Sequence, residues 1–301
     1  MSLALCICTY KRPEELRACL ASVLRGSELP DEILVSDDSP DDRDGRLVAE
    51  AFPHVAYQVG PRRSLGPNRN ACLDRVTATH VLFVDDDVVL PETCIATARR
   101  VAADQRTVVT GYERKHVDGV AHLVTPHNAD FLGFQRVPPD GEHRSIVINA
   151  TVFPRRLFDE ARFDEKLRYG TEEVDMARHA VALGYRIRVA PELRVDHHPS
   201  PANRSEYERY VDASRLYGTL KSYWRYDRSV PKAAAYAAVA PLHLLGSGVR
   251  RRGRGGAAPA FRAIGLAARY TWLEARHGHP APRPADGPRQ EERPCAASSA
   301  R

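Results

Sequence analysis

The 301-residue sequence lacks the marks of several protein classes. Its six cysteines include no Cys-x-x-Cys pair, which argues against a disulfide-stapled scaffold and against an ordinary zinc module. No charged segment precedes the strand-like run LALCIC that begins at Leu3, so we expect no signal peptide and a reducing, cytoplasmic location. Hydrophobic residues make up 43% of the chain and charged residues 28%, which excludes a disordered protein and favours a folded α/β core.

Lysine is also scarce, and the basic charge is unevenly spread. Five lysines stand against 39 arginines, which a coding bias toward GC-rich codons explains better than selection for nucleic-acid contacts. Residues 246–301 carry 11 arginines and four acidic residues, whereas the rest of the chain has a net charge of −2. Because only Phe261, Tyr270 and Trp272 in this basic region could stack on bases, we expect no nucleic-acid partner.

The first part of the chain alternates short apolar runs with helical patterns. The runs typical of strands cover residues 3–8, 32–36, 55–59 and 80–84. The helical patterns cover residues 13–24, 44–52, 68–76 and 92–102. This alternation predicts an α/β fold with a mostly parallel, Rossmann-like sheet and helices on both faces. Ligands of such sheets bind beyond the carboxyl ends of the strands.

Acidic side chains follow two of these predicted strands. Asp37 and Asp38 come after the second strand, and the fourth is followed by Asp85, Asp86 and Asp87. Five carboxylates at one edge of a sheet repel one another unless a cation lies among them. Mg²⁺ and Mn²⁺ bind through one or two carboxylates together with substrate phosphates. The sequence therefore predicts a divalent-metal site that also holds a nucleoside diphosphate.

Two further clusters of titratable residues lie in the second part of the chain. Glu172 and Glu173 occupy the first turn of a predicted helix, where acidic side chains also interact favourably with the helix dipole. His197 and His198 end a later extended stretch. Two histidines at a strand end, in a chain with a predicted cation site, favour a ligand role over a purely structural one.

The C-terminal region contains an apolar stretch followed by a basic one. Residues 231–249 are rich in alanine, but Pro241 interrupts the run, which is also too short to span a membrane. Three arginines follow at positions 250–252. The stretch therefore either packs on the body or lies on an anionic membrane surface. From residue 278 onward, the abundance of Pro, Arg, Ala and Ser predicts disorder.

Taken together, these segments resemble the family 2 glycosyltransferases, which are inverting enzymes with the GT-A fold. The segments that carry the resemblance are CTYKRPEEL (8–16), DEILVSDDS (31–39), GPNRNACLD (66–74), THVLFVDDDVVLP (79–91), FDEKLRYGTEEVDMARHAVALGYRI (163–187) and VDHH (195–198). The implied organisation is a nucleotide-sugar-binding half at 1–123, an acceptor-binding half with the catalytic base at 124–226, C-terminal helices at 227–277 and a disordered tail at 278–301.

The resemblance implies a donor site at the ends of the first strands. Its residues would be Thr9, Tyr10, Arg12, Asp37, Asp38, Arg69, Asp85 and Asp86. Thr9 and Tyr10 would line the nucleotide, and Asp37 would accept a hydrogen bond from the base. Arg69 would brace the base or the acidic cluster.

The resemblance also implies a bound Mn²⁺ or Mg²⁺. Asp85 and Asp87 match the family's DXD motif, with Asp87 as the direct metal ligand and Asp85 nearer the ribose or the sugar. His197 matches an additional ligand of the metal or the diphosphate, and His198 is the alternative.

The catalytic base is implied to lie in the acidic pair. In the family's Glu-Asp pair the second acid deprotonates the acceptor, and here Glu173 stands in its place, with Glu172 or Asp175 as alternatives. The implied reaction is direct displacement on a nucleotide-diphosphate sugar by a hydroxyl of a saccharide, lipid-linked or small-molecule acceptor. The base and the sugar of the donor stay open.

Two other functions fit parts of the same pattern. An apolar strand followed by Asp-x-Asp-x-Val is also typical of phosphatases that form an aspartyl phosphate, here on Asp85 with Asp87 nearby. Such enzymes usually place the motif on the first strand and use a downstream lysine, whereas here three strands precede it. A non-catalytic binding module on the same fold is the second alternative.

Overall fold

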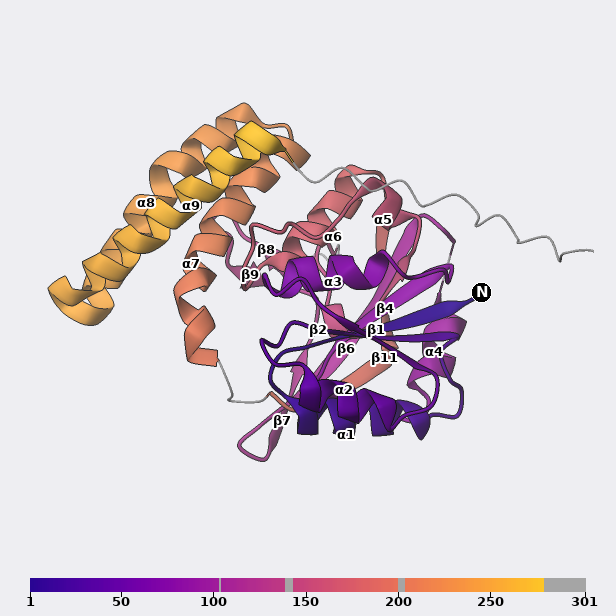
Figure 1. Cartoon of the computed structure of the whole chain (residues 1–301). Coiled ribbons are helices and arrows are strands. Elements are labelled where there is room, and N and C mark those ends of the chain that lie inside the picture. Colours follow the sequence, from indigo (N-terminus) through magenta and orange to yellow (C-terminus); the bar gives the residue numbers. More distant parts are fainter. Residues whose placement is uncertain (103, 139–142, 200–203, 279–301) are drawn as a thin grey trace, which may run out of the picture.

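The computed structural model describes residues 1–102, 104–138, 143–199 and 204–278. They form one large sheet with helices on both faces and a group of three long helices at one side (Figure 1). The predicted tail lies outside the described residues, apart from Gly278.

The sheet contains nine strands and is mostly parallel. Its order is β3-β2-β1-β4-β10-β6-β11-β5, with β7 paired to β6. Strand β10 runs antiparallel to both neighbours, and β5 and β7 are also antiparallel to their partners. The bounds are β1 Leu3–Thr9, β2 Glu32–Asp37, β3 Val55–Val59, β4 His80–Asp85, β5 Val88–Val89, β6 Thr107–Val117, β7 Val120–Val124, β10 Thr151–Pro154 and β11 Arg186–His197. A separate pair consists of β8 Asn128–Ala129 and β9 Gln135–Arg136.

The helices agree with the predicted alternation. They are α1 Pro13–Leu24, α2 Arg43–Glu50, α3 Leu65–Leu73, α4 Cys94–Val101, α5 Leu157–Glu160, α6 Glu172–Ala182, α7 Arg204–Lys221, α8 Val230–Arg252 and α9 Ala257–His277. Short helical turns cover Ile148–Ala150, Ser222–Tyr226 and Gly253–Gly256. None of the helices within the described ranges combines the length and the hydropathy that a membrane-crossing segment needs.

The alternation of side chains along β1 explains why the sheet is covered on both faces. Leu3, Leu5 and Ile7 pack with α1, α2 and α4, whereas Ala4 and Cys6 pack with α3, α5 and α6. Successive side chains of a strand point to opposite faces, so a strand that is apolar at every position is buried on both. Five of the six cysteines lie in the described ranges, and all five are buried free thiols.

The sheet joins the two predicted halves of the chain. Strand β10 pairs with β4, and β11 pairs with β6 and β5, so strands from the second half extend the sheet of the first. Helices α7, α8 and α9 form a separate apolar cluster around Tyr217, Tyr236 and Tyr270. The division into a donor half and an acceptor half stays a prediction.

Phe83 on β4 is the centre of an aromatic cluster directly below the acidic strand end. Its ring is 1% exposed and makes edge-to-face contacts with Phe153, Phe158 and Phe163. We expect Phe83→Ala to lower the free energy of unfolding by about 3–5 kcal/mol, because it removes buried apolar surface and leaves a cavity. Urea denaturation measures this loss. A loss no larger than that of Phe261→Ala, at a mostly exposed position, would contradict the packing described here.

Candidate active site

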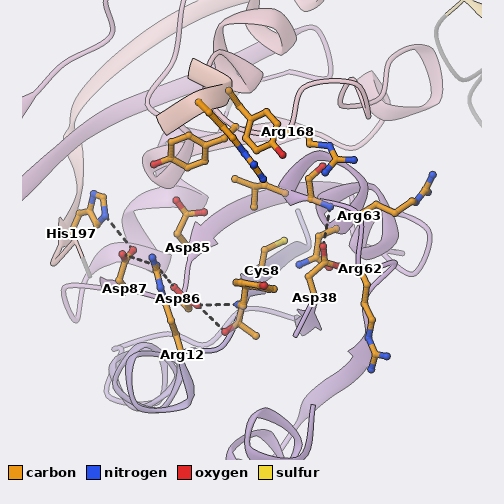
Figure 2. A pocket seen from close by; sticks show the side chains of 18 residues that line it. Cys8, Arg12, Asp38, Arg62, Arg63, Asp85, Asp86, Asp87, Arg168 and His197 are labelled. Carbon is orange, nitrogen blue, oxygen red and sulfur yellow. Dashed lines mark hydrogen bonds and ion pairs between the residues drawn. The ribbon is translucent and has the colours of Figure 1, made fainter. Parts of the chain in front are cut away.

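A cavity of about 340 Å³ opens at the carboxyl edge of β1 and β4. Eight of the predicted site residues line it: Thr9, Tyr10, Arg12, Asp38, Asp85, Asp86, Asp87 and His197. Figure 2 shows Asp85, Asp86 and Asp87 with Arg12 and His197 at one end of the cavity, and Arg168 away from them. Arg62 and Arg63 lie near Asp38. The cavity is therefore acidic at one end and basic at the other.

Strand pairing brings the acidic residues and the histidine together. Cys8 lies opposite Asp85 in the parallel β1–β4 pair, so the two strands end at the same edge. The chain then turns through Asp86 and Asp87 into β5, where Val88 pairs with His197 of β11. This short antiparallel pair is the reason that a histidine 110 positions later in the sequence reaches the acidic turn.

Asp86 is buried and holds the loop after β1. Its carboxylate accepts hydrogen bonds from Thr9 Oγ1 at 2.8 Å, from the backbone N–H of Tyr10 at 3.4 Å and from Arg12 at 3.1 Å. Burial raises the pKa of Asp86 to about 7, although the Arg12 guanidinium opposes that rise. Asp86 therefore lines the cavity and also fixes the positions of Thr9, Tyr10 and Arg12, which line it too.

Asp87 and His197 belong to a chain of hydrogen bonds. His197 Nε2 lies 3.2 Å from Asp87 Oδ1, and His197 Nδ1 lies 2.5 Å from Glu113 Oε1. Asn149 in turn donates to Glu113 Oε2 at 3.2 Å. Burial alone would lower the pKa of His197, but hydrogen bonds to Asp87 and Glu113 outweigh it and raise that pKa to about 10. The imidazole therefore has a fixed orientation and is protonated at neutral pH, so a cation could bind Nε2 only in place of that proton.

Arg69 holds the third aspartate from inside the protein. Its guanidinium is 2% exposed, lies over the ring of Phe163 and donates to Asp85 Oδ1 at 3.1 Å. The backbone N–H of Asp85 donates to Asn149 Oδ1 at 2.9 Å. Arg69 does not line the cavity. It braces the acidic cluster, which is one of the two roles expected for it.

The residues at this edge fit a divalent ion in part. Within the described ranges, no three His, Cys, Asp or Glu side chains are grouped so that they could hold a metal. Arg12 instead bridges Asp86 and Asp87, with Nη1 at 3.1 Å from each carboxylate. Asp87 and His197 nevertheless form a typical pair of metal ligands. The Nδ1 atom of His197 is held by the carboxylate of Glu113, as the second nitrogen of a metal-binding histidine usually is. Two such ligands with the phosphates of a substrate suit Mn²⁺ or Mg²⁺.

Asp37 lies outside the cavity, in contrast to its expected contact with the base. Its oxygens accept from Tyr57 OH at 2.9 Å and from the backbone N–H of Ser39 at 2.8 Å. Gly45 packs so closely that a Cβ there would lie 2.2 Å from Asp37 Oδ2. Asp38 lines the cavity instead and is held by the backbone N–H groups of Arg62 and Ser64.

Glu172 and Glu173 begin α6, and neither is among the residues that line the cavity. Glu172 is buried, and its Oε1 has no hydrogen-bond partner in the described structure. Burial raises the pKa of Glu173 to about 7, with the charges of Glu172 and Asp85 adding to the rise and Arg69 opposing it. Glu173 therefore lies within electrostatic reach of the acidic strand end and can take up a proton near neutral pH.

Two residues of this site were missed by the sequence analysis. Glu113 lies inside the long strand β6 and Asn149 in the turn before β10, and both are buried. Glu113 is followed by Arg114, Lys115 and His116, so no sequence pattern singled it out as a buried acid. Among the residues that line the cavity there is no lysine, which gives the phosphatase alternative no support.

Three comparisons with known proteins bear on this site. The family model described as Glycosyl transferase family 2 matches residues 4–161. The succinoglycan biosynthesis protein ExoM of Rhizobium meliloti (strain 1021) is 29% identical over 216 residues, which are 66% of this chain and 67% of ExoM.

Solved structures share the fold. The mannosyltransferase PcManGT from Pyrobaculum calidifontis, in complex with GDP-Man and Mn²⁺, aligns with a TM-score of 0.55 and 16% identity over 90% of this chain and 87% of its own. S. aureus TarS 1–349, in complex with UDP-GlcNAc, aligns with a TM-score of 0.63 and 16% identity over 90% of this chain and 82% of its own.

Buried ion pairs anchor the helix that carries Glu172 and Glu173. Lys221 at the end of α7 is 1% exposed, and its Nζ lies 2.7 Å from Asp164 Oδ2 and 2.8 Å from Asp175 Oδ2. Asp175 is on α6, one turn after Glu172. Lys166 extends the network, because it lies 3.0 Å from Asp164 and 2.9 Å from Glu274 on α9. The network therefore ties α6 to both α7 and α9.

We expect Lys221→Met to lower the free energy of unfolding by about 3–5 kcal/mol, because it leaves the buried carboxylates of Asp164 and Asp175 without their shared cation. Urea denaturation measures the change. Lys232→Met is the matched control, since the side chain of Lys232 is mostly exposed and lies 3.9 Å from Asp227. Equal stabilities of the two variants would show that the buried pairs do not hold α6 in place.

Proposed function

Because the chain belongs to glycosyl transferase family 2, we propose that it transfers a sugar from a nucleotide-diphosphate sugar to an acceptor hydroxyl, with inversion at the anomeric carbon and with a divalent ion. That it is a glycosyltransferase with a GT-A type fold confirms the expectation from the sequence. The observation that carries the finer proposal is the gathering of Asp85, Asp87 and His197 at one end of the cavity, with Glu173 in electrostatic reach.

We propose that the cavity holds the donor along its length. Thr9 and Tyr10 end β1 at the cavity wall, and Asp38 faces it near Arg62 and Arg63. Two proteins with the same fold were solved with GDP-Man and with UDP-GlcNAc, which supports a nucleotide sugar as the donor here. Asp38 would be the acid that contacts the nucleotide, since the oxygens of Asp37 accept hydrogen bonds from Tyr57 and Ser39.

Asp87 and His197 would hold the divalent ion, and Asp85 would face the sugar or ribose. The bound ion would neutralise the charge that develops on the departing diphosphate. The Mn²⁺ in the complex of PcManGT supports the choice of Mn²⁺ or Mg²⁺. In the ion-free arrangement Arg12 and His197 supply this positive charge, so each would give up one contact with Asp87.

Glu173 would act as the catalytic base. A carboxylate with a pKa near 7 is half deprotonated at neutral pH and accepts a proton readily as the acceptor oxygen attacks. Its neighbour Glu172 would serve by keeping that pKa high through like-charge repulsion. Direct displacement needs no covalent intermediate, so no nucleophilic side chain is required.

The acceptor is proposed to be a saccharide, free or carried on a lipid. ExoM, named for succinoglycan biosynthesis, is 29% identical to this chain, which supports a saccharide acceptor. The C-terminal helices are proposed to touch the inner face of a membrane peripherally. A cytoplasmic location is supported by the five free cysteines of the described ranges.

The metal role is tested by hydrolysis of UDP- and GDP-sugars in the presence of Mn²⁺. We expect Asp87→Asn to lower the rate of nucleoside diphosphate release by about 100-fold or more, because it removes a charged ligand of the ion. EDTA should have the same effect on the unaltered chain. Asp41→Asn, at an exposed position that does not line the cavity, is the matched control. Unchanged rates in excess EDTA would refute the metal dependence.

The base is tested by Glu173→Gln. This change should lower the turnover number by roughly 10²–10⁴ while leaving donor binding intact, because only proton removal from the acceptor is lost. In the unaltered chain, kcat/KM should rise with pH and level off above about pH 7, since the base must be deprotonated.

Glu172→Gln provides the comparison. This change should lower the pKa of Glu173, because it removes the neighbouring negative charge. The acidic limb of the pH profile should therefore move to lower pH, and turnover should persist. Loss of turnover in Glu172→Gln with an active Glu173→Gln would show that the base is the first acid of the pair.

A further inference from the structure

Helix α8 exposes an apolar face that no other described element covers. Val239, Leu242, Gly246 and Val249 are spaced by three or four residues, so they lie on one side of the helix. Leu242 is 69% exposed. The opposite side, with Tyr236, Ala240 and Leu244, packs into the cluster formed with α7 and α9. The sequence analysis left two alternatives for this stretch, packing on the body or lying on a membrane. Packing on the body explains only one side of α8.

Helix α9 exposes a mixed aromatic and basic face. Phe261 and Trp272 are 62% and 54% exposed and are 11 positions apart, which is three helical turns. Arg262, Arg269 and Arg276 are spaced by seven and lie beside them. The guanidinium of Arg276 lies 5.1 Å from the centre of the Trp272 ring. Bulky rings next to arginines on one helix face are typical of helices that lie in a membrane interface.

The surface of these two helices carries no acidic group. Between Asp227 and Glu274 the sequence contains no Asp or Glu, although it contains seven arginines and one lysine. Glu274 itself is 2% exposed and is paired with Lys166 and Arg225. The exposed faces of α8 and α9 are therefore both apolar and uniformly positive.

We propose that the exposed faces of α8 and α9 dock the protein on an anionic lipid bilayer, with Leu242, Phe261 and Trp272 entering the interface and the arginines contacting lipid phosphates. This deepens the proposed function, because it assigns the membrane contact to named residues. Helices α8 and α9 pack against each other and against α7, at the side of the sheet (Figure 1). The network through Glu274 links this surface to Asp164 and Asp175 beside the candidate base.

Charge and composition favour lipid over other occupants. A second copy of this chain would bring a like-charged, acid-free face against this one, which is unfavourable. A nucleic acid would be held by the arginines alone and would gain nothing from Leu242 or Phe261. A bilayer with anionic head groups satisfies both the apolar and the basic residues.

The test is cosedimentation of the full chain with vesicles of phosphatidylcholine and with vesicles of phosphatidylcholine and phosphatidylglycerol in equal parts. We expect binding to the anionic vesicles, weakened by salt, and little binding to the neutral ones. The variant L242D/F261D/W272D should bind anionic vesicles about tenfold more weakly or worse. The matched control L47D/V120D/L123D makes the same charge change at equally exposed apolar positions on the body and should bind as the unaltered chain does.

Three results would overturn the proposal. The unaltered chain could fail to bind anionic vesicles, the two triple variants could lose binding equally, or L242D/F261D/W272D could bind anionic vesicles as tightly as the unaltered chain does. Thermal shifts with UDP- and GDP-sugars in Mn²⁺ are measured on the same samples. Lost vesicle binding with an intact donor shift affects the membrane proposal alone, whereas a donor shift missing from the unaltered chain contradicts the proposed function.

Discussion

Three consecutive aspartates at the end of a buried strand repel one another, and the rest of the site depends on how that repulsion is balanced. Cationic side chains from three different places in the chain pair with them. Arg69 of α3 pairs with Asp85, Arg12 before α1 pairs with both Asp86 and Asp87, and His197 of β11 pairs with Asp87. The histidine is in turn held by Glu113. An ion bound at Asp87 would replace positive charge that Arg12 and His197 already supply. The fold can therefore be stable when no ion is bound.

The strands and helices that form the acidic edge could be predicted from the sequence. The strands β1 to β4 and the helices between them were predicted nearly to their ends, because a doubly buried parallel strand is apolar at every position and its helices alternate with it. The acidic edge followed from that order, since parallel strands end at one edge. The approach of His197 did not follow from spacing, because it needs the two-residue strand β5, which no periodicity reveals.

Side-chain direction was the other limit. Asp37 and Asp38 are adjacent in the sequence, but the backbone points only one of them into the cavity, and Tyr57 and Gly45 decide which. The roles of Asn149 and Lys221 could not be predicted from the sequence either. Each acts through partners far away in the sequence, Asn149 through Asp85 and Lys221 through Asp164 and Asp175, so their roles arise only from tertiary packing. The C-terminal helices were expected to pack on the body or to face a membrane; one side of α8 packs on α7 and α9, and its other side is exposed.

In the proposed function, the acidic strand end exchanges its protein cations for a divalent ion when a nucleoside diphosphate is present. Titration of Mn²⁺ followed by the electron paramagnetic resonance signal of the free ion tests this directly, with UDP or GDP and with or without the protein. We expect the protein to remove additional Mn²⁺ from solution in the presence of one of these diphosphates, and we expect His197→Ala and Asp87→Asn to abolish this extra binding. Equal Mn²⁺ uptake by the unaltered chain and by both variants would contradict it.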